Sequence, residues 1–185
     1  MQPTREQSVD GHLIRTYDGL LSQPEIEALT VALEEGEFVR NEVARPDTSM
    51  FRHWALNIPL EMAAKLPVYR PTIDAAAAFA QSLHYEIYRC YCNYASYGDM
   101  LFTHTDCEAG ERDLTALWYV APNWEVEWGG ETLFFNSNLD AQAVVSPRPG
   151  RLVVFEGVIR HVGRPPNRIC FGPRYTLAFK LKSKS

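Results

Sequence analysis

Apolar residues recur at helical spacing in two segments of the first half of the chain. Ser22 and Glu25, three residues apart, form the capping pattern that opens many helices, and apolar positions then follow every three or four residues up to Gly36. This pattern predicts a helix over residues 23–35. A second, alanine-rich segment predicts a helix over residues 71–83, whose small side chains would allow close packing against a sheet.

After His84 the chain changes to short alternating runs rich in aromatic and β-branched residues, which is the pattern of half-buried strands. Segments containing Gly or Pro separate most of these runs and predict turns. The strands predicted in this way cover residues 85–94, 100–103, 114–120, 132–136, 141–145, 151–155, 158–162 and 175–181.

Helices followed by about eight short strands predict a mainly β fold with flanking helices, arranged as a sandwich or jelly roll. The length of 185 residues suits one domain, and no linker divides the chain. We therefore expect a single domain over residues 1–185. Within it, residues 1–84 would supply helical support and substrate-side segments, and residues 85–182 would form the jelly-roll core.

The composition limits the partners that the protein can have. A net charge of −5 argues against a chain built to bind a phosphate backbone, so nucleic acid is not an expected partner. No apolar run is long enough to cross a bilayer, and the N-terminus lacks the apolar core of a secretory signal. The four cysteines do not form a disulfide framework in a chain of this length. These features predict a cytoplasmic monomer or homodimer that contacts no membrane.

The sharpest chemical feature is His104-Thr105-Asp106, between a predicted strand and a polar loop. On an extended chain, residues two apart project to the same face, so this imidazole and carboxylate can reach one metal ion. His161, at the end of a later predicted strand, is the leading candidate for a third ligand. Two histidines and one carboxylate form the facial triad that suits non-haem Fe(II). A lone His-x-Asp sequence also occurs by chance at surface turns, so this feature alone is weak.

Arg174 opens the last predicted strand and follows the three candidate ligands in the chain. Oxygen activation by Fe(II) needs electrons from a cosubstrate, and a 2-oxo acid supplies them while it chelates the metal. The distal carboxylate of such an acid needs a cationic partner, and the arginine fork is a bidentate match. Alone, Arg174 would be a surface charge on an edge strand. Together with the candidate ligands in this order, it indicates a cosubstrate site.

With these residues the chain resembles the Fe(II)- and 2-oxoglutarate-dependent dioxygenases, and especially their prolyl-hydroxylase-like branch. The resemblance covers residues 85–181. The matching features are Tyr94, His104-x-Asp106, the strand LTALWYV (114–120), Gly129-Gly130-Glu131-Thr132-Leu133, PGRLVVF (149–155), His161 and Arg174-Tyr175. The resemblance implies a double-stranded β-helix, a cupin-like jelly roll that holds iron at its open end.

The resemblance also implies roles for the matching residues. The implied iron ligands are His104, Asp106 and His161. The residues implied to bind 2-oxoglutarate are Arg174, Tyr119, Tyr94 and Thr132. Packing in the core with a hydrogen-bonded hydroxyl is the alternative for both tyrosines, and it is as good an explanation for Tyr94 but a weaker one for Tyr119. The implied cofactors are Fe(II), 2-oxoglutarate as cosubstrate and O2, with ascorbate as a useful additive in vitro.

The implied reaction is hydroxylation of an unactivated C–H bond, or a related oxidation, with release of succinate and CO2. Asp106 argues against halogenation, because halogenases of this family have a small residue there that leaves room for chloride. A short chain suits a small molecule, an amino acid or a natural-product intermediate, while a peptide segment also fits. Candidate substrate contacts near the mouth of the site are Arg52, His53, Arg89, Tyr91, Trp118 and Trp128.

Other interpretations of the same residues stay open. Nucleic-acid demethylases share the iron triad and end in Arg-x5-Arg, a spacing that Arg168 and Arg174 match and that Arg174 and Lys180 approach. A cupin-like module that binds metal or ligand without turnover would share the fold. Cys90 and Cys92 would share one face of a strand, but no second pair at zinc spacing accompanies them, so core packing is favoured.

Overall fold

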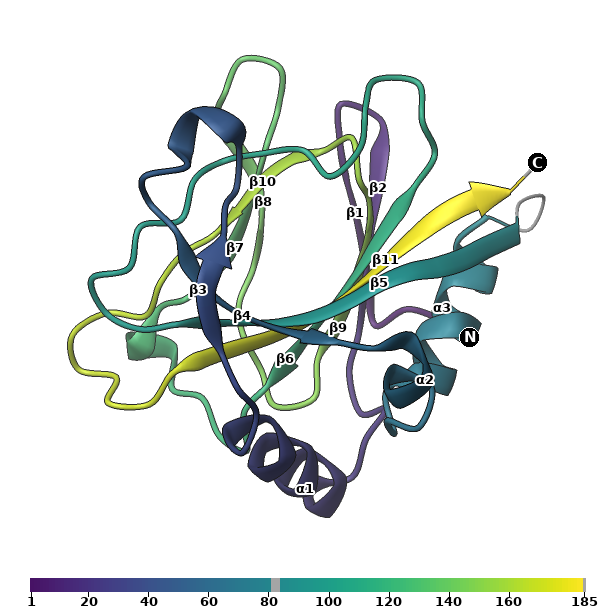
Figure 1. The fold of residues 1–185 in the computed structure, drawn as a ribbon. Coiled ribbons are helices and arrows are strands. Elements are labelled where there is room, and N and C mark those ends of the chain that lie inside the picture. Colours follow the sequence, from purple (N-terminus) through teal and green to yellow (C-terminus); the bar gives the residue numbers. More distant parts are fainter. Residues whose placement is uncertain (81–83, 185) are drawn as a thin grey trace.

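The computed structural model describes residues 1–80 and 84–184, and its main feature is an eight-stranded antiparallel sheet (Figure 1). The strands lie in the order β1-β2-β9-β6-β11-β5-β4-β3. Their bounds are β1 Arg5–Val9, β2 His12–Tyr17, β3 Val39–Glu42, β4 His53–Ile58, β5 His84–Ala95, β6 Leu114–Val120, β9 Leu152–Glu156 and β11 Arg174–Lys184.

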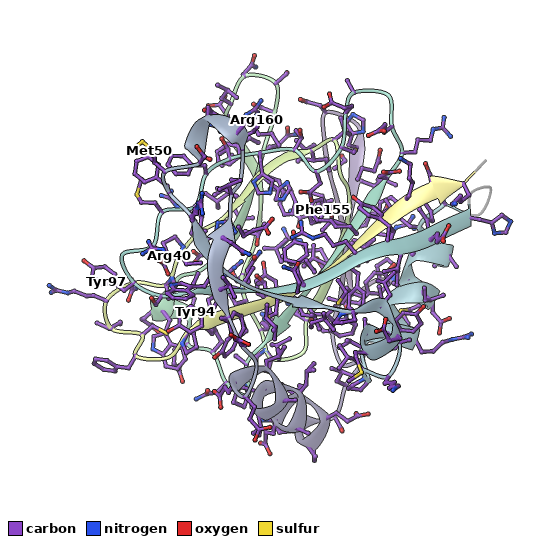
Figure 2. All side chains as sticks on the ribbon, in the orientation of Figure 1. Arg40, Met50, Tyr94, Tyr97, Phe155 and Arg160 are labelled. Atoms are coloured by element: carbon purple, nitrogen blue, oxygen red, sulfur yellow. The ribbon has the colours of Figure 1, made fainter. Side chains whose placement is uncertain are left out.

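A smaller sheet in the described residues, with the order β10-β7-β8, faces the large one and completes the predicted jelly roll. Its bounds are β7 Thr132–Phe135, β8 Ala141–Val145 and β10 Arg160–Gly163. Apolar side chains of both sheets share a core, in which the rings of Phe134 and Phe155 lie 5.0 Å apart. Phe155 accordingly lies in the interior, whereas Met50 and Tyr97 lie at the periphery (Figure 2). The predicted fold class is confirmed.

Helices cover the other face of the large sheet. Their bounds are α1 Gln23–Glu34, α2 Leu60–Ala63 and α3 Tyr69–Phe79, and single 3-10 turns lie at η1 Pro46–Thr48 and η2 Val126–Trp128. Leu29 and Leu33 of α1 are buried against this face, as are Ala75 and Ala76 of α3, whose small side chains allow close approach. Within the described part of the chain, no helix combines the length and the apolar character that crossing a membrane requires.

The large sheet separates two environments, because successive side chains of a strand point to opposite faces. The residues of β11 that pack toward the helices are Tyr175, Leu177, Phe179 and Leu181. The residues between them line a cavity on the opposite face, and these are Arg174, Thr176, Ala178 and Lys180. The neighbouring strands β5 and β6 follow the same alternation. Every second residue of these strands therefore points toward the cavity, and the residues between them point toward the helices.

Several predicted elements are confirmed with little change. The helix predicted over 23–35 is α1, and the strands predicted over 114–120 and 141–145 are β6 and β8 with the predicted bounds. The second helix, α3, begins two residues before its predicted start. It ends at Phe79, and positions 81–83 of its predicted span lie outside the described residues.

The N-terminal part differs from its prediction, because it supplies β1–β4 to the large sheet in addition to helices. β1 and β2 form a hairpin around Asp10 and Gly11, whose φ angles of 50° and 86° suit the tight turns that Asp-Gly favours. The strand predicted over 100–103 is wrong, since this segment is irregular and only His104 pairs, through an isolated bridge. The chain before His104 therefore depends on tertiary contacts and not on a sheet ladder.

Trp118 offers a test of the packing between sheet and helices. Its side chain is 0% exposed, and its Nε1–H donates a 2.8 Å hydrogen bond to Thr72 Oγ1 of α3. Thr72→Val removes the acceptor and leaves a buried donor unpaired, so we expect the free energy of unfolding to fall by about 1–3 kcal/mol. Urea titration measures this difference. Trp118→Phe should lower the free energy of unfolding by a smaller amount in the Thr72→Val background than in the wild type. Equal reductions in both backgrounds would contradict the contact.

Candidate functional site

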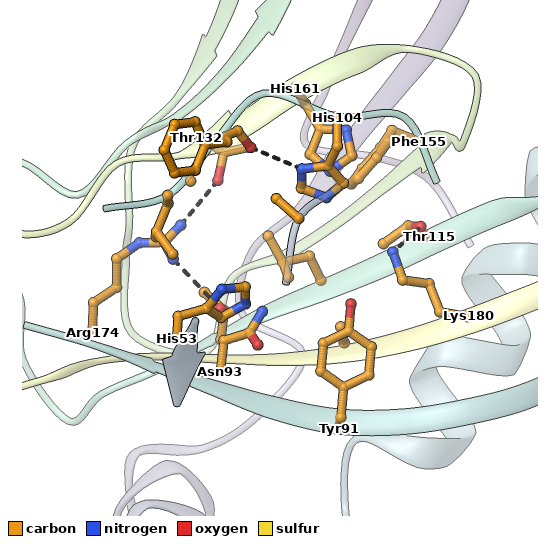
Figure 3. Close-up of a pocket in the computed structure, with 17 residues that line it drawn as sticks. His53, Tyr91, Asn93, His104, Thr115, Thr132, Phe155, His161, Arg174 and Lys180 are labelled. Carbon is orange, nitrogen blue, oxygen red and sulfur yellow. Dashed lines mark hydrogen bonds between the residues drawn. The ribbon is translucent and has the colours of Figure 1, made fainter. Parts of the chain in front are cut away.

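A cavity between the two sheets gathers polar side chains from distant parts of the sequence (Figure 3). Arg174 and Lys180, both from β11, lie on opposite sides of it. His104 and His161 lie across from β11, close to the ring of Phe155. The cavity therefore brings together two of the candidate metal ligands, His104 and His161, with the candidate carboxylate anchor Arg174, and Asp106 lies beside both histidines.

Backbone pairing brings the three candidate ligands together. His104 and His161 form an antiparallel bridge, in which each N–H donates to the other residue's carbonyl oxygen, at 3.0 and 2.9 Å. The N–H of Asp106 donates to Gly157 O at 2.7 Å. One ligand atom from each of the three side chains lies within 4.8 Å of the others, close enough for a single metal ion. Two imidazole nitrogens and one carboxylate oxygen are the donor set that suits non-haem Fe(II).

Both imidazoles leave Nε2 free to bind a metal ion, because Nδ1 is occupied by a backbone contact. Nδ1 of His104 lies 3.0 Å from the carbonyl oxygen of Phe102, and Nδ1 of His161 lies 2.9 Å from that of Ile159. Because a carbonyl oxygen only accepts, each Nδ1 carries the proton and each Nε2 keeps its lone pair. Burial, which Asp106 opposes in part, lowers the pKa of His161 to about 4. His161 is therefore neutral near pH 7, the form in which imidazole binds metals.

Asp106 is held by two further side chains. Thr115 donates a 2.6 Å hydrogen bond to Asp106 Oδ2, and the ammonium of Lys180 forms an ion pair with the same oxygen. Oδ1 lies 3.4 Å from His104 Nε2. Burial alone would raise the pKa of Asp106, but the charge of Lys180, with smaller contributions from the two histidines, holds this pKa well below its ordinary value. The carboxylate is therefore ionised and ready to bind a cation.

Arg174 is a buried cation, 3% exposed, whose partners are all neutral. Its guanidinium donates to Gly130 O at 2.6 Å, to Thr132 Oγ1 at 3.0 Å and to Thr176 Oγ1 at 3.4 Å. A Cβ on Gly163 would lie 3.1 Å from both terminal nitrogens, so a glycine there makes room for the guanidinium. A buried guanidinium with neutral partners fits an anionic ligand, and a carboxylate matches its fork in a bidentate manner.

Thr132 and Tyr119 stand beside this arginine. Thr132 lines the cavity, and its hydroxyl lies 2.7 Å from that of Tyr119. Tyr119 is 2% exposed, and the centre of its ring lies 5.3 Å from the guanidinium carbon of Arg174. Tyr119 therefore supports the walls of the pocket through Thr132 and does not itself line the cavity.

Among the candidate substrate contacts, His53 and Tyr91 line the cavity. Burial lowers the pKa of His53, which makes this imidazole neutral near pH 7. Arg89 does not line the cavity. Its guanidinium pairs with Glu42, with Nη2 at 2.7 Å from Oε2, and stacks over Tyr91 with its central carbon 4.1 Å from the ring centre. Arg89 therefore holds Tyr91 in place from outside.

The positions of Tyr94 and Trp118 correct the roles expected for them. Both belong to the helix-facing set of their strands, β5 and β6, because of the alternation described above. Tyr94 packs against Phe38 and Tyr175, with ring centres 5.8 and 5.7 Å away. Trp118 is the buried partner of Thr72. Neither side chain lines the cavity, so core packing explains both.

Arg52 and Trp128 also lie outside the cavity. Arg52 is exposed and precedes β4, and its carbonyl oxygen accepts a 2.9 Å hydrogen bond from Arg40 Nε. Trp128 packs edge-on against Trp124, with ring centres 5.4 Å apart, beside a separate surface hollow. The aromatic segment around η2 is therefore structural in this region.

Four polar residues of the cavity were not predicted from the sequence to belong to the site, namely Asn93, Thr115, Thr176 and Lys180. The alternation of side chains along a strand was the available signal. Lys180 lies six residues after Arg174 in β11, so both side chains point to the same face. Asn93 is next to Tyr94 in β5, so their side chains point to opposite faces. The side-chain oxygen of Asn93 is buried without a hydrogen-bond partner among the described residues, so a donor on a bound ligand would satisfy it.

A jelly roll whose cavity is lined by two histidines and a buried arginine, with an aspartate beside the histidines, has the architecture of non-haem iron oxygenases that use a 2-oxo acid. Comparison with known families agrees, because residues 91–180 match the model of the 2OG-Fe(II) oxygenase superfamily. No curated protein matches the chain significantly. Residues 91–180 therefore resemble the 2OG-Fe(II) oxygenase superfamily, oxidoreductases that use Fe(II) and 2-oxoglutarate. The predicted resemblance is confirmed.

Solved structures share this fold at low sequence identity. A prolyl-4-hydroxylase from Pseudomonas putida has a TM-score of 0.68 and 20% identity, over 91% of this chain and 92% of that chain. A viral collagen prolyl hydroxylase from Paramecium Bursaria Chlorella virus-1 has a TM-score of 0.65 and 17% identity, over 100% and 97%. HygX from Streptomyces hygroscopicus, solved with nickel and 2-oxoglutarate bound, has a TM-score of 0.65 and 14% identity, over 91% and 82%.

The buried imidazole of His161 predicts acid sensitivity of the metal-free protein. Its pKa is about 4 in the folded protein against 6.5 ordinarily, so the unfolded chain binds more protons between these values and stability falls as the pH falls through them. With EDTA present, acidification from pH 6.5 to about pH 4 should lower the free energy of unfolding by an amount on the order of 1–3 kcal/mol through His161. Urea titrations of His161→Gln should therefore show a flatter pH dependence, while the exposed His84→Gln retains the wild-type slope. Equal slopes for wild type and His161→Gln would refute this.

Proposed function

We propose that the chain is a 2-oxoglutarate-dependent hydroxylase in which His104, Asp106 and His161 bind Fe(II). Arg174 binds the 5-carboxylate of 2-oxoglutarate. The observation that carries this proposal is a single cavity lined by two histidines of the three-ligand cluster and by a buried arginine with only neutral partners. When bound, Fe(II) would activate O2, which is the oxidant for C–H hydroxylation, with two electrons from the decarboxylation of 2-oxoglutarate to succinate and CO2.

The chain's own residues hold and shield these groups. Arg174 receives one end of the diacid, and Thr132 lies next to it. At the other end, Nε2 of each histidine and an oxygen of Asp106 would hold the metal. The ring of Phe155 packs edge-on against His161, with centres 4.7 Å apart, which excludes water from one side of the ligand set.

The substrate side of the cavity is polar and partly covered. His53, Tyr91 and Asn93 come from β4 and β5 and leave the metal ligands free. Phe51 packs against Phe102 with ring centres 5.2 Å apart, so the segment after η1 covers the chain that leads to His104. This cover supports a compact substrate, and we propose a small molecule, an amino acid or a natural-product intermediate. HygX has also been solved with hygromycin B bound.

Hydroxylation of a residue within a peptide is the second candidate. A prolyl hydroxylase from Trichoplax adhaerens, with 17% identity and a TM-score of 0.66, was solved in complex with a peptide fragment of a hypoxia inducible factor. Met50, 92% exposed, lies next to Phe51 in the cover and would contact a longer substrate. A demethylase of nucleic acids is disfavoured by the net charge of −5. A cytoplasmic location and a monomeric or homodimeric state remain predictions from the sequence.

Turnover of the cosubstrate tests the reaction class. With Fe(II), O2 and ascorbate, the protein should convert 2-oxoglutarate to succinate, and a screen of metabolites and peptides should identify the substrate that accelerates it. His104→Ala and Asp106→Ala remove metal ligands, so succinate formation and Co(II) binding should both fall to background. His84→Ala, an exposed histidine away from the cavity, is the matched control. An active His104→Ala/Asp106→Ala double variant would overturn the metal assignment.

Gly163→Ala tests the arginine anchor without altering any ligand. The added methyl group would lie 3.1 Å from both terminal nitrogens of Arg174, so the guanidinium must move. We expect the dissociation constant of 2-oxoglutarate for the Co(II)-loaded protein to rise about tenfold, the scale of one charged hydrogen bond. Calorimetric titration measures this constant, and Co(II) affinity should stay unchanged.

Gly172→Ala is the matched control for this variant, because a Cβ at that position meets nothing within 4 Å. It should bind 2-oxoglutarate like the wild type. If Gly163→Ala also bound the cosubstrate with wild-type affinity, the anchor would have to be another arginine, such as Arg164 or Arg168.

A further inference from the structure

Lys180 is a buried cation on the cavity face of β11, with 7% exposure. Its side chain points to the same face of β11 as that of Arg174 but lies at the opposite side of the cavity (Figure 3). The pairing of β11 with β5 shifts register directly after Lys180, which leaves Tyr88 of β5 without a partner in the ladder. Bulges of this kind redirect neighbouring side chains. The local irregularity thus lies where a long charged side chain enters the cavity.

The ammonium of Lys180 completes a closed ring of contacts with Thr115 and Asp106. It forms an ion pair with Asp106 Oδ2 and donates to Thr115 Oγ1 at 3.1 Å. The hydroxyl of Thr115 donates in turn to Asp106 Oδ2 at 2.6 Å. Thr115 and Lys180 lie directly opposite each other in the pairing of β6 with β11, so the sheet itself fixes this ring.

Both donors use the same oxygen of the carboxylate. Oδ2 accepts from Thr115, pairs with Lys180 and lies 3.5 Å from His161 Nε2, while Oδ1 has neither donor and lies 3.4 Å from His104 Nε2. Outer contacts of this kind fix the orientation of a metal ligand. Lys180 also adds a positive charge beside the ligand set in a region of low dielectric, where charges interact far more strongly than in water.

We propose that Lys180 is a positioning residue that, together with Thr115, makes Asp106 a one-oxygen metal ligand and fixes a positive charge beside the metal. The inference rests on the proposed function, because it assumes that Asp106 binds the metal. A neighbouring positive charge disfavours Fe(III) more than Fe(II). Lys180 therefore favours the ferrous state in which the iron of this site is used.

Three variants separate the effect of the positive charge from the effect of the hydrogen bond to Asp106. They are Lys180→Met, Lys180→Arg and Thr115→Val. In the iron-loaded protein, Lys180→Met should shift the midpoint potential of the Fe(III)/Fe(II) couple to more negative values, as measured by spectroelectrochemistry. The same variant should bind Co(II) about tenfold more tightly, because a competing cation has been removed. Lys180→Arg keeps the charge and should stay close to the wild type in both measurements. Thr115→Val also keeps the charge and should shift the potential much less than Lys180→Met.

A merely structural role for Lys180 predicts a different pattern. It would lower the thermal stability of Lys180→Met without a negative shift of the potential or tighter Co(II) binding, and that result would overturn the inference. Lys180→Gln, which is neutral but can still donate a hydrogen bond, provides the same comparison if the Met variant does not fold. Wild-type protein that binds neither Co(II) nor 2-oxoglutarate would contradict the proposed function. Wild-type binding of both, with an unchanged potential in the neutral variants, would contradict only the role of Lys180.

Discussion

The register of β11 between β5 and β6 is the constraint on which the site depends. Because side chains alternate between the two faces of a sheet, this register sends Arg174 and Lys180 into the cavity and Tyr175 and Phe179 into the core beneath the helices. A slip of one residue would exchange the two sets, burying cations among apolar side chains and removing both charges from the cavity. The apolar face thus specifies the register, and the register specifies the site.

The charges in the cavity indicate that it is built for a ligand and not for stability. Arg174, Lys180 and Asp106 are all taken out of water, and buried charges of this kind are neutral or unfavourable for folding compared with apolar residues of similar size. Lys180 and Asp106 compensate each other, whereas Arg174 has only neutral hydrogen-bond partners. The two packed cores on either side of the large sheet supply the stability that allows such a site.

The parts of this account that the sequence could predict are those with a local pattern or a specific order of residue types. β6 and β8 have clear alternation, and the order of His104, Asp106, His161 and Arg174 indicated a family. Asp10-Gly11 is also a local signal, because this dipeptide favours the tight turn of the hairpin between β1 and β2. The existence and type of these elements therefore follow from short-range chemistry.

The remaining features depend on contacts that no local pattern encodes. Whether Asn93 or Tyr94 faces the cavity depends on the register of β5, and a change of one residue reverses the answer. Lys180 acquires its role only because folding places it against Asp106, a residue far away in the chain. β4 is a strand because β5 offers it an edge for pairing, and β3 pairs in turn with the edge of β4. These are tertiary effects, and the structure is needed to find them.

The central claim is that one cavity binds Fe(II) and 2-oxoglutarate together. The most direct measurement is an anaerobic titration of the Fe(II)-loaded protein with 2-oxoglutarate, followed by visible absorption, since chelation of ferrous iron by the 2-oxo acid produces a charge-transfer band. The account predicts a band that saturates at one 2-oxoglutarate per chain, is lost in Asp106→Ala, and requires far more 2-oxoglutarate in Arg174→Ala. No band in the wild type, or the same titration curve in all three proteins, would contradict it.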